Sequence, residues 1–138
     1  MTEFSVLITN HHLNQFQGSE TATYTLAHAL RRRGIQASIA TTYLGRVGEI
    51  LLNEGFEVTD CLNDWSNRKF DLIHAHHNTM AILARAVFPR APILFVSPGV
   101  LPFLEAPPSV DIGLGGIAGV SEEVVKRLET EVNLENVT

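Results

Sequence analysis

The chain has 138 residues, of which 45% are hydrophobic and 18% are charged, and its formal net charge is −5. This length suits one domain with its own core, and this composition excludes a disordered chain. The acidic balance argues against nucleic acid and against strong attraction to anionic lipid. Cys61 is the only cysteine, so no intrachain disulfide can form, which fits a reducing compartment.

Neither a secretory signal nor a spanning helix is expected. The start Met1-Thr2-Glu3 lacks a basic stretch and leads directly into a short apolar run. The longest apolar stretch, residues 91–104, is broken by prolines, whereas a spanning helix needs about 20 apolar residues. We therefore expect a cytoplasmic protein, and peripheral attachment at the inner face of the membrane stays open.

Hydrophobic periodicity and turn residues divide the chain into alternating strands and helices. In chain order we expect strand 4–9, helix 20–33, strand 35–41, helix 45–53, strand 56–59, strand 70–76, helix 79–88, strand 93–97, strand 116–120 and helix 122–131. Residues 60–69 and 98–112 are expected to be irregular. This alternation predicts an α/β fold, a Rossmann-like doubly wound parallel sheet in three α/β/α layers, as a single domain.

The ends of these helices carry recognisable signals. Ser19, Asn78 and Ser121 each stand before a helical pattern and are expected to be N-caps. Gly34 follows three arginines and is expected to end its helix. The helix at 79–88 is apolar almost all round, so we expect it to be buried.

The most informative stretch is Phe-Asp-Leu-Ile-His-Ala-His-His-Asn at residues 70–78. It places His74, His76 and His77 where a parallel strand ends, which is where ligands bind in this architecture. In the strand order 3-2-1-4-5-6, the first and fourth strands are neighbours. The loop after the first strand would then face these histidines.

Two other groups of residues have functional interpretations. Gly18 in Gln17-Gly18-Ser19-Glu20 lets a ligand approach the backbone at a helix start, which favours an anion. His11 and His12 could join His74 and His76 in a zinc site, but no carboxylate stands at a recognisable ligand spacing.

Two motifs near the C-terminus have weaker interpretations. Gly113-x-Gly115-x-x-Ala118 matches the dinucleotide fingerprint as a string, but it leads into a strand instead of opening a helix. Ser121 lies at a strand-to-helix turn like a nucleophile, yet the closing glycine of that motif is replaced by Glu123.

In order, these pieces resemble the N-terminal domain of family 4 glycosyltransferases, which have the GT-B fold. The matching segments are Val6-Leu7-Ile8-Thr9, Gly18-Ser19-Glu20, Leu26 to Gly34, Asp71 to His77, and Ile117 to Glu122. The resemblance implies a retaining, metal-independent transferase that takes a nucleotide sugar as its donor. In such enzymes the N-terminal domain mostly binds the acceptor, and the C-terminal domain holds the nucleotide.

The resemblance also implies roles for particular residues. Gly18 and Ser19 would approach the donor diphosphate, and His76 would be the catalytic residue that reaches the transferred sugar or its phosphate. The residues expected to bind the acceptor or the sugar are Asn10, His11, His77, Asn78 and Gly99.

The chain departs from the family pattern in three places. Gln17 replaces the first glycine of the phosphate loop, and Pro98-Gly99 replaces a histidine pair after the fifth strand. The resemblance covers only the family's N-terminal domain, whereas the paired glutamates of the family belong to its second domain, so the spacing of Glu123 and Glu131 is assigned no role. We expect residues 1–132 to form the acceptor-side domain and residues 133–138 to lead toward a C-terminal domain supplied in cis or in trans.

The resulting hypothesis is the acceptor-binding half of a retaining glycosyltransferase of the hexosyltransferase type, inactive alone, with no cofactor and no metal. Its partners would be a nucleotide sugar, an acceptor molecule and the C-terminal domain, without nucleic acid. Two alternatives remain: a non-catalytic Rossmann-like module that binds a ligand or partner, and a histidine-dependent metal hydrolase.

Overall fold

A computed structural model describes residues 3–97, 106–108 and 110–131 of the chain. Within these residues, one sheet of parallel strands has the order β3-β2-β1-β4-β5-β6. The strands are β1 (Ser5–Thr9), β2 (Gln36–Ala40), β3 (Glu57–Thr59), β4 (Leu72–His76), β5 (Ile93–Ser97) and β6 (Gly116–Gly119). The Rossmann-like fold and the neighbouring positions of the first and fourth strands are confirmed.

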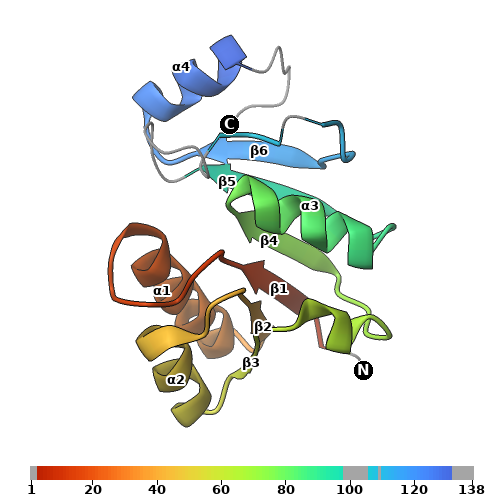
Figure 1. Cartoon of the computed structure of the whole chain (residues 1–138). Helices are drawn as coiled ribbons and strands as arrows, with labels where there is room; N and C mark the ends of the chain where they lie inside the picture. Colours follow the sequence, from red (N-terminus) through yellow and green to blue (C-terminus); the bar gives the residue numbers. More distant parts are fainter. Residues whose placement is uncertain (1–2, 98–105, 109, 132–138) are drawn as a thin grey trace.

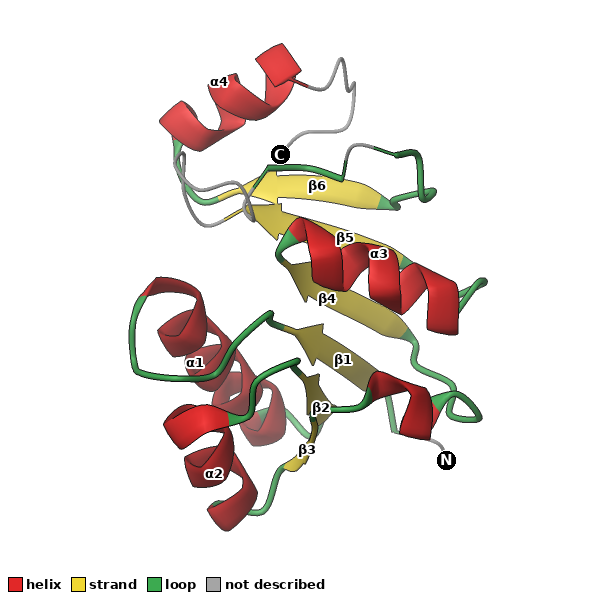
Figure 2. Cartoon of the chain, viewed as in Figure 1, coloured by secondary structure: helices red, strands yellow, loops and turns green. Residues whose placement is uncertain are grey.

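The helices are α1 (Gly18–Arg32), α2 (Gly45–Asn53), α3 (Asn78–Val87) and α4 (Glu122–Glu131), with a 3₁₀ helix η1 (Leu62–Trp65). Helices α1 and α2 lie together beside β1, β2 and β3, whereas α3 packs over β4 and β5 (Figure 1). Helix α4 contacts β6 at the far end of the sheet (Figure 2). No helix of the described residues is long and apolar enough to cross a membrane.

The alternation of β1 divides the core between the two faces of the sheet. Leu7 joins the cluster under α3 and α4, which includes Ile73, Met80 and Phe95. Val6 and Ile8 point the other way and join the cluster under α1 and α2. Every residue of β1 is buried, because the central strand of a parallel sheet is covered on both faces.

Several expected helix ends were correct and two were wrong. Ser121 Oγ accepts the Val124 N–H at 3.3 Å, as an N-cap should, and Gly34 ends α1 with a φ of 75°. Ser19 instead lies inside α1, and Asn78 is the first residue of α3. The chain enters these helices through backbone turns at the preceding residues, without side-chain caps.

Two further expectations were wrong. Helix α3 is not buried all round, since Ile82 and Leu83 are 37% and 38% exposed. Only one side of the helix meets the sheet, at Met80, Ala81 and Ala84. The segment 60–69, expected to be irregular, contains η1.

Candidate functional site

The carboxyl ends of β1 and β4 lie side by side, because the two strands pair in parallel with Thr9 opposite Ala75. Asn10 and His76 therefore leave the sheet at the same level. Thr23 of α1 lies between them, with its Oγ1 3.0 Å from Asn10 Nδ2 and 3.3 Å from His76 Nδ1. Because the Asn10 amide donates to Thr23, the Thr23 hydroxyl is left to donate to His76.

This polar chain is closed to solvent. Asn10 and Thr23 are fully buried, and His76 is 2% exposed. The sequence predicts His76 as the histidine that touches a ligand and His74 as the hydrogen-bonded support. In the structure His76 occupies the hydrogen-bonded inner position. His74 lies half-buried beside it, with ring centroids 4.9 Å apart.

A second link joins the same two strand ends. The His11 backbone N–H donates to His77 Nδ1 at 2.9 Å. A neutral His77 that accepts at Nδ1 must carry its proton on Nε2. The His12 ring stacks on His77 at 5.4 Å, and His12 Nε2 lies 3.8 Å from a carboxylate oxygen of Glu20. We call His11, His12, His74, His76 and His77 the histidine cluster.

His77 has an unusual backbone conformation at the turn from β4 into α3. Its φ is 70°, and it is the only non-glycine with a positive φ among the described residues. Such a conformation costs about 1–2 kcal/mol for a residue with a Cβ. The turn aims the His77 ring back toward the loop after β1, where it meets the His11 N–H.

Burial keeps the three β4-end histidines uncharged. It lowers the pKa of His76 from 6.5 to about 3; the charges of His74 and His77 add to this, and a backbone hydrogen bond with Thr9 opposes it. Burial also lowers the pKa of His74 to about 4. For His77, burial and then charge repulsion from His12 and His11 lower the pKa to about 4. At neutral pH these rings offer hydrogen bonds and no positive charge.

The start of α1 is open in a way that suits close approach. A Cβ built on Gly18 meets no atom within 4 Å, and Gln17 makes no side-chain hydrogen bond to the helix. Ser19 is 8% exposed, so its side chain turns inward. Glu20 is buried in the same first turn, where its carboxylate accepts the Gln15 N–H at 2.6 Å.

Of the two remaining predicted residues, the structure describes Asn78 but not Gly99. Asn78 is half-buried at the start of α3, directly after His77. Gly99 lies outside the described residues. The structure therefore brings Asn10, His11, His76 and His77 together at one edge of the sheet, and the roles assigned to them stay predictions.

Sequence reasoning missed Thr23 and the part played by Glu20. Thr23 stands inside an amphipathic helix, where a lone threonine gives no signal until β4 docks beside β1. Glu20 looks like an ordinary first-turn carboxylate, yet it holds the loop before α1. Its contact with Gln15, five residues earlier, could have been guessed from the polar run that precedes the helix.

The histidines do not assemble a full metal-ligand set in the described part of the chain. His11 Nδ1 and His12 Nδ1 lie 3.4 Å apart, but no group of three or more histidine, cysteine, aspartate or glutamate side chains there could hold an ion. The hydrolase alternative therefore gains no support from these residues.

Comparison with known proteins gives one informative likeness. No protein-family model matches the chain, and no curated protein matches it. The crystal structure of MurG from Acinetobacter baumannii is similar, with a TM-score of 0.64 and 12% sequence identity. The match covers 88% of this chain and 42% of the MurG chain, so this chain spans less than half of that length. At this identity the likeness shows the fold.

Proposed function

We propose that the chain is the acceptor-binding half of a glycosyltransferase that moves a sugar from a nucleotide-sugar donor to an acceptor hydroxyl. The observation that carries this proposal is that α1, whose start at Gly18 is open, packs its second turn against the histidine-tipped end of β4 through Thr23 and His76. MurG, whose fold the chain shares over 88% of its length, is a glycosyltransferase of the GT-B fold.

The proposal divides the reaction between two halves. A C-terminal domain, in cis or in trans, would hold the nucleotide, so the isolated chain would not turn over. The α1 start, with Gly18 and Ser19, would approach the donor diphosphate through backbone N–H groups. The neutral histidines cannot supply charge to the phosphate, which leaves this task to the helix start and to the other half.

The buried position of His76 refines its role. We assign it to positioning Asn10 through Thr23 rather than to direct contact with the sugar. His11, Asn78 and the neighbouring His77 would line the acceptor side. The acceptor hydroxyl would attack the anomeric carbon on the face from which the diphosphate leaves, which gives retention. The anomeric coupling constant of the product would report inversion if this stereochemistry were wrong.

The test uses the chain joined to the domain that completes the enzyme, with release of nucleoside diphosphate from a panel of nucleotide sugars as the readout. Gly18→Ala should lower this release at least about tenfold, because a Cβ blocks close approach of the phosphate. It should leave the melting temperature unchanged or slightly higher, since the position is open.

Gly115→Ala is the matched control. Its Cβ would make only an ordinary contact, 3.5 Å from the Ile93 carbonyl oxygen, at the other edge of the sheet. Its activity should equal that of the wild type. Turnover by the isolated chain, or full activity of Gly18→Ala, would contradict the proposal.

A non-catalytic ligand-binding module is the second candidate. The burial and neutrality of His76 and His77 favour it, since these rings suit hydrogen bonding better than proton transfer. A completed enzyme that binds a nucleotide sugar and an acceptor without releasing nucleoside diphosphate would select this candidate.

A further inference from the structure

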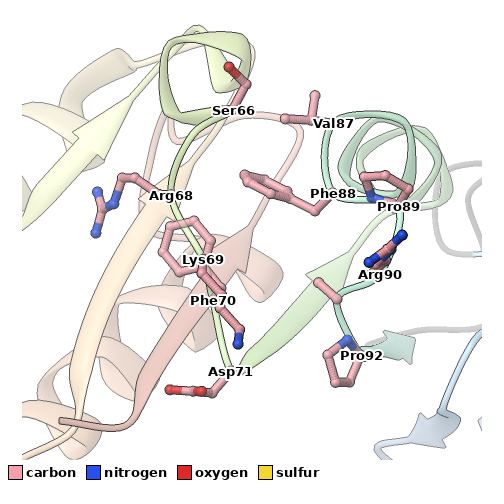
Figure 3. Close-up of a pocket in the computed structure, with 11 residues that line it drawn as sticks. Ser66, Arg68, Lys69, Phe70, Asp71, Val87, Phe88, Pro89, Arg90 and Pro92 are labelled. Carbon is pink, nitrogen blue, oxygen red and sulfur yellow. The ribbon is translucent and has the colours of Figure 1, made fainter. Parts of the chain in front are cut away.

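A hollow of about 420 Å³ lies at the amino ends of β4 and β5, on the edge of the sheet opposite to the histidine cluster. One wall is the segment 66–71 that leads into β4, and the other is the turn 87–92 between α3 and β5 (Figure 3). Its size falls within the usual range for small-molecule sites. The proposed glycosyl transfer makes no use of it.

The inner lining of the hollow is apolar and aromatic. Phe70 and Phe88 are 3% and 6% exposed, and their rings meet edge to face with centroids 5.4 Å apart. Val87 and Pro92 complete this part of the lining. Such a surface favours a flat or compact apolar body.

Two basic side chains stand on opposite walls of the hollow. Lys69 and Arg90 are exposed, and neither has a hydrogen bond or ion pair between its side chain and another described residue (Figure 3). Arg68 is already engaged, since its guanidinium pairs with Glu57 at 3.0 Å and lies 4.8 Å from the Phe70 ring centroid. The free charge at the hollow therefore comes from Lys69 and Arg90.

The nearby carboxylate does not cancel this charge at close range. Asp71 Oδ2 accepts the Ser5 backbone N–H at 2.8 Å and lies 3.2 Å from the Ser5 hydroxyl. These hydrogen bonds orient the carboxylate toward β1. In a chain of net charge −5, a local excess of positive charge beside apolar rings selects a negatively charged ligand.

The wall formed by the turn 87–92 is held in place before any ligand arrives. The Arg85 guanidinium donates to the carbonyl oxygens of Phe88, Pro89 and Ala91, at 3.1, 3.1 and 2.8 Å. The Ile73 N–H donates to the Pro92 carbonyl at 2.8 Å, which ties the turn to β4. A preformed site loses little affinity to ordering.

We propose that this hollow binds a small aromatic carboxylate. The ring lies against the apolar lining formed by Val87, Pro92 and the accessible edges of Phe70 and Phe88. The carboxylate lies at the mouth within reach of Lys69 and Arg90. Apolar contact with this lining supplies the apolar part of the affinity, and charge-assisted hydrogen bonds select the anion over a neutral molecule of the same shape.

The test titrates the purified chain with 2-naphthoate and with its neutral amide, 2-naphthamide, while amide NMR signals are followed. The acid should bind at millimolar concentration or below and shift the signals of residues 66–71 and 87–92. The neutral ligand, 2-naphthamide, should bind about tenfold more weakly than 2-naphthoate. Equal binding of the two, or no shift with the acid, would overturn the proposal.

Charge variants give the second arm. Lys69→Gln and Arg90→Gln should each weaken naphthoate binding severalfold and leave naphthamide binding unchanged. Arg46→Gln is the matched control, because Arg46 is an exposed cation on α2 that does not line the hollow. All three side chains are exposed, so folding is preserved. Naphthoate binding that survives the double variant Lys69→Gln/Arg90→Gln at full strength would also overturn the proposal.

Discussion

At His77, a strained backbone conformation and a stabilising hydrogen bond of the side chain act in opposite directions on stability. The left-handed φ of 70° penalises any residue with a Cβ, whereas the hydrogen bond from His11 rewards the imidazole. The alanine variant keeps the penalty and loses the bond. The glycine variant loses both.

We therefore expect His77→Gly to be more stable than His77→Ala by about 1 kcal/mol, even after the extra backbone entropy of glycine in the unfolded chain. Urea unfolding of the two variants measures this difference. Ser66→Gly against Ser66→Ala is the control pair, because the φ of −57° at Ser66 suits alanine and glycine gains nothing there. An alanine variant as stable as the glycine variant would show that the His77 turn is not strained.

At the level of elements, hydrogen bonds with the first turn of α2 help to hold the loop after β1 in place. The Leu13 carbonyl accepts the Val47 N–H at 2.9 Å, and the Asn14 carbonyl accepts the Arg46 N–H at 3.2 Å. These bonds satisfy donors in the first turn of α2, which has no side-chain cap. The loop that carries His11 and His12 is thereby fixed against the helix.

Gly45 makes this contact possible. Its φ is 55°, and an added Cβ would lie 2.5 Å from the Leu13 carbonyl oxygen and 2.7 Å from Asn14 Cα. Because these are backbone atoms, the loop itself would have to move. Gly45→Ala should cost about 3 kcal/mol in the free energy of unfolding and shift the His11 and His77 ring signals.

Gly18→Ala, at the start of the helix that follows this loop, is the control, since that position is open and its φ is not positive. It should leave both the stability and the histidine signals near their wild-type values. A Gly45→Ala protein with unchanged histidine signals would contradict the dependence of the site on α2.

The sequence predicts features that are set by local residue patterns and misses those that are set by contacts between elements. The helix Gly45–Asn53 and the strand Ile93–Ser97 were predicted at their observed bounds, because periodicity and flanking glycine or proline residues mark them locally. The strand order 3-2-1-4-5-6 entered only as a condition and is the observed order, since handedness and alternation alone also allow other doubly wound orders. The caps at Ser19 and Asn78 were wrong, because tertiary contacts set the path by which the chain enters those helices.

The inner structure of the site could not be predicted for a related reason. A histidine at a strand end can point into the protein or out of it, and the sequence pattern is the same. The link from Asn10 through Thr23 to His76 joins three elements that are distant in the chain. It exists only after the sheet and α1 have packed together.

For the whole molecule, the buried histidines tie folding stability to pH. The folded protein keeps His74, His76 and His77 neutral down to pKa values of about 4, 3 and 4, whereas in the unfolded chain they titrate near 6.5. Below pH 6.5 the unfolded chain therefore binds more protons than the folded protein. Stability is fully present above about pH 6.5 and falls as the pH approaches 4.

Each histidine should contribute a slope of about 1.4 kcal/mol per pH unit within that window. Urea unfolding between about pH 7.5 and about pH 5 measures the combined slope of the unfolding free energy against pH. The lower part of this range is where the folded and unfolded states bind different numbers of protons. His76→Asn removes one of the three groups and should reduce the slope by about one histidine's share, although it also lowers stability at pH 7.5 by disturbing Thr23. The comparison therefore rests on the slope and not on the absolute stability. A His76→Asn protein that loses stability as steeply as the wild type would show that His76 is not kept neutral by burial.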